Sequence, residues 1–341
     1  MVLYFDRKTI FFNQNINKMD ILSSFNAKLL NENTIFAITG ASGWFGRATL
    51  NLLWEFLGEV NFYKRVHAFS SKDDVITIEN KFTLPTQSLE KIFELKSLDY
   101  LFHYAFLTRD RVEQMNIQSY IDINTGITDL IIKRLKEGDT KGVFATSSGA
   151  VYEQDYTLVD CERELIKNPY GALKRREEIL LSKSCESLKI SCLILRVFSV
   201  MGAFMTKPTA YAVGDFIYQA LKNQHIRILA ERPVWRSYTD IQDLVYLGIS
   251  YLIEPSQLAP MCVDTGGHTV EMDTLARQVL LCLQIDPNSI SRNLDLSTEP
   301  SRYVGKSAEI DQLSSKLNLH FSSFEGQVSD TVAYLKMLWD F

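Results

Sequence analysis

The chain has 341 residues and a mass of 39.1 kDa, with 46% hydrophobic and 23% charged residues and a formal net charge of −5. This length suffices for one large domain or two closely packed domains with a sizeable core. Because the net charge is negative, we expect the protein to bind neither nucleic acid nor an anionic membrane surface. We therefore expect a small-molecule substrate, and any acidic group on it would be met by local arginines.

Cysteines, histidines and apolar runs narrow the class of protein further. No continuous apolar stretch reaches the roughly 18 residues of a membrane span, so we expect no membrane partner and a cytoplasmic location. The histidines do not stand in ligand spacing, which predicts no metal site. The five cysteines are odd in number and scattered, which indicates buried free thiols: Cys161, Cys185, Cys192, Cys262 and Cys282.

Residues 1–33 precede the first clear strand and match no motif, so we expect an added N-terminal extension that forms a hairpin or a helix. From Ile35 onward strands and helices alternate. Strands are expected at 35–39, 65–69, 100–105, 143–147 and 191–195, and helices at 46–57, 117–135 and from 168. This alternation predicts an α/β fold with a doubly wound parallel sheet of Rossmann type.

A glycine-rich turn follows the first expected strand. Gly40, Gly43 and Gly46 have the spacing G-x-x-G-x-x-G between an apolar strand and a helix. Such a turn lets a pyrophosphate approach the backbone and rest on the helix N-terminus, and tight packing of strand on helix is the less favoured alternative. We expect a dinucleotide site formed by Gly40, Ser42, Gly43, Trp44, Phe45 and Gly46.

The end of the second strand bears on the choice of dinucleotide. A preference for NAD usually places an acid there to bind both ribose hydroxyls, whereas this strand ends in Ser70, Ser71 and Lys72. Hydroxyls and an amine suit a 2′-phosphate, and Arg47 is placed to assist. We therefore expect NADP. If the strand ends later, Asp73 or Asp74 would take the ribose, and NAD would be the cofactor.

Three residues have the side chains needed for proton transfer. The strand 143–147 delivers Ser148 to the carboxyl edge of the sheet, where ligands of doubly wound folds bind. Asn168 and Pro169 are typical of a helix start, which places Tyr170 and Lys174 one turn apart on one helix face. The ammonium would favour ionisation of the phenol. Ser148 would then hold a substrate oxygen while Tyr170 passes it a proton and a nicotinamide exchanges a hydride.

After Arg196 the alternation breaks up into loops and short helices. We expect residues 34–197 to form the dinucleotide-binding domain, with 236–255 packing back on it. Residues 198–341 are expected to form mainly a smaller substrate-binding domain.

In order and spacing these motifs resemble the extended branch of the short-chain dehydrogenase/reductase superfamily, which comprises nucleotide-sugar epimerases, dehydratases and reductases. The resemblance runs from about Ile35 to the C-terminus. It is carried by residues 39–46, 103–105, 124, 147–152, 170–174, 196–198, 236–238 and 264–267.

The resemblance implies specific roles. Ser148, Tyr170 and Lys174 would be the catalytic set, and Lys174 would also bind the nicotinamide ribose. Tyr170, Ala105 and Asn124 would likewise lie at the cofactor. A homodimer through the helices around 117–135 and 170–181 is also implied.

The same resemblance suggests the substrate contacts. Arg236 stands where the family pairs an arginine with the substrate diphosphate, and Arg302 is a second candidate. A surface arginine bonded to Asp240 or Asp243 is the alternative for Arg236. Ser199 replaces the usual asparagine, which indicates a less common substrate.

Two departures from the family pattern narrow the reaction. Dehydratases and decarboxylases of the family carry an acidic residue in the two positions after the catalytic hydroxyl. The 3,5-epimerase/reductases carry a cysteine beside that hydroxyl. In this chain Gly149 and Ala150 follow Ser148. We therefore expect NADP(H)-dependent reduction of a nucleotide-linked 4-keto sugar or a related ketone. The alternatives are an NAD-retaining nucleotide-sugar 4-epimerase and a non-catalytic dinucleotide sensor.

Overall fold

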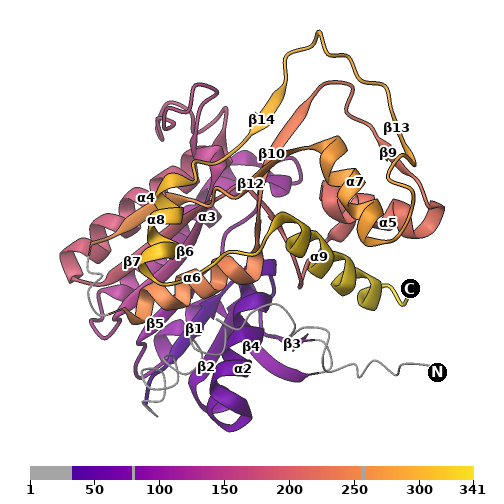
Figure 1. The fold of residues 1–341 in the computed structure, drawn as a ribbon. Helices are drawn as coiled ribbons and strands as arrows, with labels where there is room; N and C mark the ends of the chain where they lie inside the picture. Colours follow the sequence, from indigo (N-terminus) through magenta and orange to yellow (C-terminus); the bar gives the residue numbers. More distant parts are fainter. Residues whose placement is uncertain (1–32, 79–80, 255–258) are drawn as a thin grey trace, which may run out of the picture.

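The computed structural model describes residues 33–78, 81–254 and 259–341. Except for Asn33, the expected N-terminal extension lies outside these residues. The described chain is built around one large sheet, with a second group of short strands and helices beside it (Figure 1).

The large sheet has eight strands in the order β11-β7-β6-β5-β1-β2-β4-β3, and every neighbouring pair is parallel except β3 with β4. The chain runs outward from β1 in both directions, first through β2 and then through β5, so the α/β doubly wound fold is confirmed. The strands are β1 (Phe36–Thr39), β2 (Val66–Ser70), β3 (Asp74–Ile78), β4 (Phe82–Ser88), β5 (Tyr100–His103), β6 (Gly142–Ser148), β7 (Ser191–Val197) and β11 (Met261–Asp264).

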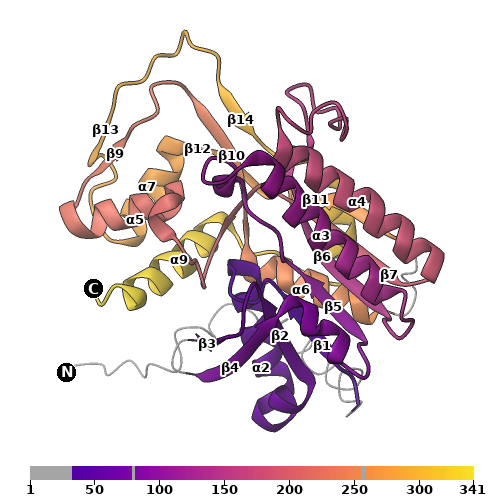
Figure 2. The ribbon, with the colours of Figure 1, turned by 180° about the vertical axis from the view of Figure 1, so that it is seen from behind.

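Both faces of this sheet are buried, because successive side chains of a strand point to opposite faces. In β6, Phe144 joins one hydrophobic core, while Val143 and Ala145 join the other. The helices α2 (Trp44–Arg65) and α6 (Ile241–Ile253) cover the first face. The helices α3 (Ile117–Leu135) and α4 (Pro169–Leu188) cover the second, as Figure 2 shows from behind.

The expected strands and helices of the first half are present. α3 spans residues 117–135 as expected, whereas α2 continues to Arg65, eight residues past its expected end, across a break at Gly58 where φ is +68°. Three strands of the large sheet were not expected. β3 and β4 form an edge beyond β2, where buried and exposed residues alternate along β4. β11 comes from the second half of the chain and pairs with β7, so that half contributes a strand as well as α6 to the large sheet.

The remaining elements surround a second small sheet. β10 (Val234–Asp240) pairs with β12 (His268–Glu271), β14 (Ser301–Tyr303) and β8 (Ser199–Met201). β9 (Ile226–Ile228) pairs separately with β13 (Ile290–Arg292). Three helices complete this part: α5 (Ala212–Asn223), α7 (Met272–Cys282) and α9 (Phe324–Leu338). The helix α8 (Ala308–Lys316) packs instead against β11 of the large sheet.

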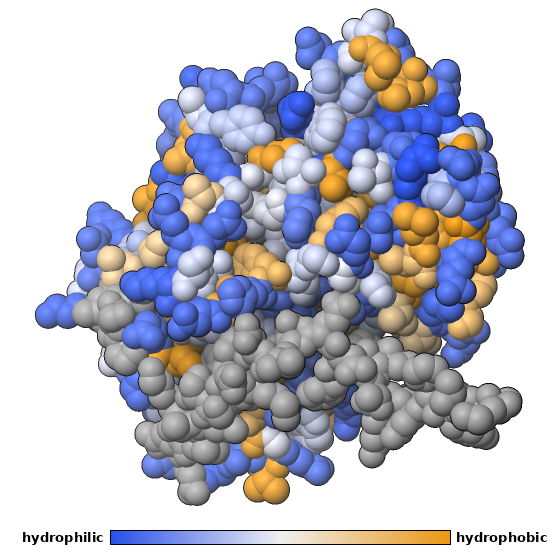
Figure 3. Space-filling model, viewed as in Figure 1, coloured by the Kyte–Doolittle hydropathy of each residue, from blue (hydrophilic) through white to orange (hydrophobic). Residues whose placement is uncertain are grey.

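On the face shown in Figure 3, hydrophilic residues cover much of the described surface, and hydrophobic residues lie between them in small groups. Of the helices in the described ranges, none has the length and apolar character that crossing a membrane requires.

The packing of α6 on β6 leads to a stability prediction. A Cβ added at Gly248 would lie 2.5 Å from the Phe144 ring, whereas Gly126, exposed on α3, has open space around it. Gly248→Ala should destabilise the protein by about 1–3 kcal/mol through overpacking, measured by urea unfolding. Gly126→Ala should be neutral or stabilising by up to about 1 kcal/mol. Equal effects of the two substitutions would contradict the close approach of α6 to the sheet.

Candidate active site

The glycine turn has the form that a bound pyrophosphate requires. Gly40 has φ +67°, and a Cβ there would lie 2.6 Å from the carbonyl carbon of Tyr104. α2 begins after Gly43 without a side-chain cap and without an acid in its first turn. The backbone N–H groups and the positive end of the helix dipole are therefore left for an anion. The residues present fit a dinucleotide at this turn.

The end of β2 lies directly beside the turn, since the Ala41 amide donates to the Phe69 carbonyl at 3.1 Å. The strand ends at Ser70, whose hydroxyl bonds to the Lys72 carbonyl at 2.6 Å. Lys72 lies 3.6 Å from Asp74 in an exposed ion pair.

The neighbouring acid Asp73 is occupied elsewhere. Its carboxylate accepts from the Ser88 amide at 2.7 Å and from Lys91 Nζ at 2.6 Å, and the bond to Lys91 lowers the pKa of this carboxyl. Arg47 donates to the carbonyls of Ser42 in the turn and Thr77 in β3, both at 3.1 Å. The polar groups near the strand end are thus hydroxyls and cations, and both acids are in ion pairs.

Ser148 and Tyr170 meet because two turns pack against each other. β6 ends at Ser148, and α4 starts with Asn168 as its cap, whose side chain accepts from the Gly171 amide at 3.2 Å. A Cβ at Gly171 would press on the Ala150 carbonyl oxygen, so the helix start lies directly on the turn after β6. The Ser148 hydroxyl lies beside the phenol of Tyr170 and acts to lower the pKa of that phenol.

The pKa of Tyr170 is raised above its ordinary value. Burial is the largest cause, and the charge of Glu177 adds to it, while the Ser148 hydroxyl and the charge of Arg109 act in the opposite direction. This differs from the sequence-based expectation that Lys174 would acidify the phenol.

The surroundings of Lys174 explain the difference. Its ammonium donates to the Thr146 carbonyl and to Glu177 Oε2, both at 2.8 Å, and it lies 3.8 Å from the centre of the Phe106 ring. The positive charge of Lys174 is thus offset by the buried carboxylate of Glu177, three residues further along the helix. Two of the three ammonium hydrogens have partners in the described structure.

A second phenol reaches the same serine. The Tyr303 hydroxyl lies 3.3 Å from Ser148 Oγ and 3.3 Å from the Val197 carbonyl oxygen, and burial raises the pKa of Tyr303 to about 12. Sequence reasoning missed this residue, because no local signal shows that β14, which lies 155 residues beyond Ser148, returns to the edge of the large sheet.

The two arginine candidates lie on different faces of the small sheet. Arg236 is opposite Tyr303 in the register of β10 and β14, so the two side chains share the face that reaches Ser148. Arg302 is opposite Trp235 on the other face, and its guanidinium lies 5.3 Å from the centre of the indole ring. The structure therefore brings Arg236 to the site and not Arg302.

The guanidinium of Arg236 bonds to the Trp235 carbonyl at 2.8 Å and to Ser301, and burial lowers its pKa. Within the described ranges no carboxylate lies at ion-pair distance from it. The expected alternative of a bond to Asp240 or Asp243 is wrong, because Asp240 caps α6 and Asp243 accepts from the Ser322 amide.

Three other expected site residues lie in or next to the loops and strand ends around the site. The Asn124 side chain accepts from the Leu107 amide at 2.8 Å and donates to the Tyr120 carbonyl at 3.2 Å, and so holds the loop after β5. The Ala105 amide lies in that loop, 3.4 Å from the Thr39 hydroxyl. Ser199 begins β8 opposite Tyr238. No group of three potential metal ligands occurs in the part of the chain that the structure describes.

Comparison with known proteins identifies the family of the chain. A family model described as the NAD dependent epimerase/dehydratase family matches residues 36–258. The chain belongs to this family. Among curated members, an uncharacterized UDP-glucose epimerase, YtcB, from Bacillus subtilis is 24% identical over 89% of this chain and 98% of its own length. A UDP-glucose 4-epimerase from Halalkalibacterium halodurans is 26% identical over 49% of this chain and 51% of its own length.

Solved structures of the family share the fold. A UDP-N-acetylglucosamine 4-epimerase from Methanobrevibacter ruminantium, in complex with UDP-N-acetylmuramic acid, has a TM-score of 0.69 and 19% identity, and it covers 89% of this chain and 99% of its own. The dTDP-glucose 4,6-dehydratase DesIV from Streptomyces venezuelae, with NAD bound, has a TM-score of 0.67 and 15% identity over 89% of this chain and 97% of its own. Members of this family are NAD-dependent enzymes of the extended short-chain dehydrogenase/reductase type.

Proposed function

We propose that this protein is an NADP(H)-dependent oxidoreductase that reduces the 4-keto group of a nucleotide-linked sugar, with Ser148, Tyr170 and Lys174 as its catalytic set. The observation that carries the proposal is the position of Tyr170 next to Ser148 at the carboxyl edge of the sheet, the same edge that carries the glycine turn. When bound, the nicotinamide would supply the hydride.

The residues of the chain have distinct tasks in this proposal. Ser148 donates a hydrogen bond to the carbonyl oxygen of the substrate, and Tyr170 gives that oxygen its proton. Lys174 binds the nicotinamide ribose through its remaining N–H. Arg236 pairs with the substrate diphosphate from the small sheet, where its guanidinium is half-buried and has no acidic partner among the described residues.

Two features support reduction over dehydration or decarboxylation. The positions after Ser148 hold Gly149 and Ala150, so no acid stands there to protonate a leaving group or orient a carboxylate. A side chain at 149 would also meet the Phe198 ring, since a Cβ would lie 2.6 Å from it. The second candidate is an NAD-retaining 4-epimerase, which is favoured by the names of the relatives. By family resemblance we also propose a homodimer through α3 and α4.

Replacement of Tyr170 by Phe tests the enzyme proposal. We expect kcat/KM for a UDP-linked 4-ketohexose, followed by loss of NADPH absorbance, to fall by about 100-fold or more, because the proton donor is removed. The Kd for NADP+ should stay within about 3-fold. Tyr218→Phe, on α5 away from the site, is the matched control. Full turnover in Tyr170→Phe would refute the proposed catalytic set. Epimer formation from UDP-glucose by the unmodified protein, without added cofactor, would favour the epimerase.

The preference for NADP follows from the polar groups at the end of β2. NADP+ should bind at least about 10-fold more tightly than NAD+ in fluorescence titrations. Lys72→Ala combined with Arg47→Ala should remove most of that difference by weakening NADP+ binding only. Tighter binding of NAD+ by the unmodified protein would show that Ser70 to Lys72 do not bind a 2′-phosphate.

The two arginines of the small sheet provide an internal comparison for the diphosphate contact. Arg236→Lys should weaken binding of UDP by about 10-fold in calorimetry, because lysine cannot form the bidentate contact. Arg302→Lys, on the opposite face of the sheet, should change the Kd by less than about 2-fold. Equal losses in the two variants would place the diphosphate elsewhere.

A further inference from the structure

Glu177 lies directly behind the proposed catalytic lysine, and the reaction just described makes no use of it. It stands one helical turn beyond Lys174 on the same side of α4, and 3% of its side chain is exposed. Oε2 accepts from Lys174 Nζ at 2.8 Å, and Oε1 accepts from His103 Nε2 at 3.1 Å. A buried carboxylate is costly unless it is paired, and here each oxygen has a partner.

The hydrogen bonds continue from Glu177 to the glycine turn. An ionised carboxylate can only accept, so His103 carries a hydrogen on Nε2, and its Nδ1 hydrogen-bonds with the Thr39 hydroxyl at 2.7 Å. Thr39 is the last residue of β1 and directly precedes Gly40. A buried chain of polar contacts thus connects the amine that would bind the nicotinamide ribose with the turn that would bind the pyrophosphate.

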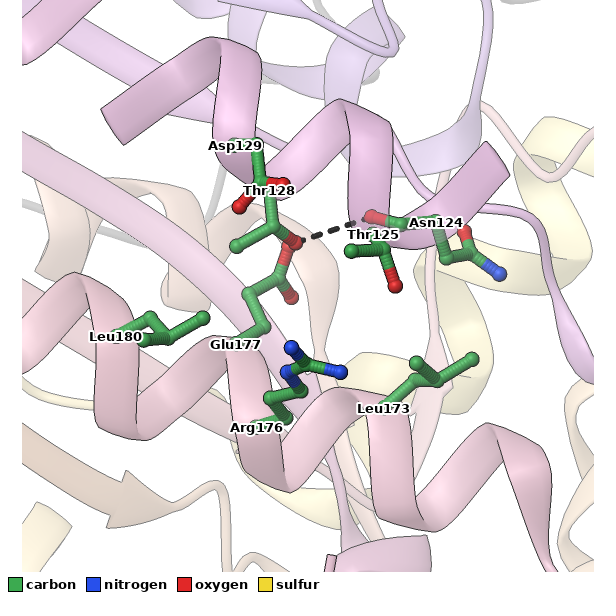
Figure 4. A pocket seen from close by; sticks show the side chains of 8 residues that line it. All are labelled: Asn124, Thr125, Thr128, Asp129, Leu173, Arg176, Glu177 and Leu180. Carbon is green, nitrogen blue, oxygen red and sulfur yellow. Dashed lines mark hydrogen bonds between the residues drawn. The ribbon is translucent and has the colours of Figure 1, made fainter. Parts of the chain in front are cut away.

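Other charged groups surround this carboxylate without bonding to it. A small pocket between α3 and α4 is lined by Glu177 and Arg176 from one helix and by Asp129 and Thr125 from the other (Figure 4). The Thr125 hydroxyl in this pocket is buried and has no partner among the described residues. Arg109, from the loop after β5, acts on Tyr170 with the opposite sign to Glu177.

We propose, on the basis of the proposed function, that Glu177 is a positioning residue that holds Lys174 on the Thr146 carbonyl and offsets its charge, so that Tyr170 keeps its proton for delivery to the substrate. Lys174 alone beside Tyr170 would favour the phenolate. With Glu177 present, the pair is close to neutral, and the phenol remains the proton donor that keto reduction requires.

The electrostatics agree with this geometry. The charge of Lys174 lowers the pKa of Glu177 and so keeps this carboxyl ionised, although burial opposes that effect. The charge of Glu177 raises the pKa of Tyr170 in addition to the larger effect of burial. Neutralising Glu177 should therefore lower the pKa of the phenol, both by removing a negative charge and by leaving the charge of Lys174 unbalanced.

The test is the pH dependence of NADPH-dependent reduction of a UDP-linked 4-ketohexose by Glu177→Gln. The amide keeps the shape and removes the charge. Because reduction needs the protonated phenol, activity is lost as the pH rises through the pKa of Tyr170. We expect this alkaline loss to move to lower pH by about one unit. Glu186→Gln, an exposed site on the same helix, should leave the profile unchanged. An unchanged profile in Glu177→Gln would overturn the proposal.

A second readout needs neither substrate nor turnover. In protein labelled with 13C at the tyrosine Cζ atoms, the Tyr170 signal is assigned by its loss in Tyr170→Phe, and its titration should move to lower pH in Glu177→Gln. An identical titration in both proteins would refute the role of Glu177. If the amide variant does not fold, Glu177→Met removes the same charge and must give the same shift. Turnover that survives Tyr170→Phe would instead refute the proposed function and leave the titration result to decide on Glu177.

Discussion

The site depends on one contact, which is the packing of the first turn of α4 on the turn that follows β6. Gly171 leaves no space for a side chain against the Ala150 carbonyl, and the Asn168 side chain donates to the same carbonyl oxygen at 3.5 Å. Because Tyr170 and Lys174 lie in that first part of α4, this contact determines where both side chains point. A helix start that lay slightly further from the sheet would separate the phenol from Ser148 and the ammonium from the Thr146 carbonyl.

Charge balance is the second constraint, and it follows from burial. The site region contains Lys174, Glu177 and His103 with exposures of a few per cent, and each of them hydrogen-bonds to at least one of the others. A lone ammonium in this place would be destabilised by the loss of water. Glu177 therefore has two effects: it stabilises the buried ammonium of Lys174, and it changes the proton affinity of the neighbouring Tyr170 phenol.

The sequence was informative where local patterns carry the signal. Alternating strands and helices predicted the doubly wound sheet, because side-chain periodicity and glycine spacing reflect local geometry. The Ser148 turn and the helix cap at Asn168 predicted where Tyr170 would lie. The acidification of Tyr170 by Lys174 was not found, because spacing on a helix shows that two groups are close but not how many other charges are buried with them. The spacing of Glu177, three residues after Lys174, could have indicated that pair.

The pairing register of strands that lie far apart in the sequence could not be predicted from local patterns. Tyr303 reaches Ser148, and Arg236 and Arg302 separate to opposite faces, only because β14 pairs with β10 in one particular register. A shift of β14 by one residue would turn Arg302 to the face of Arg236 and would turn Tyr303 away from it. Nothing in the local sequence of β14, a three-residue strand between polar segments, specifies that register. For the same reason the return of β11 to the large sheet was not expected.

The most direct measurement is a crystal structure of the protein with NADP+ and UDP bound. The account predicts the pyrophosphate of the dinucleotide on the turn from Gly40 to Gly46, its 2′-phosphate at Ser70, Ser71 and Lys72, and its nicotinamide ribose on Lys174 and Tyr170. A dinucleotide bound away from the glycine turn, or a nicotinamide ring that does not face Ser148 and Tyr170, would contradict it.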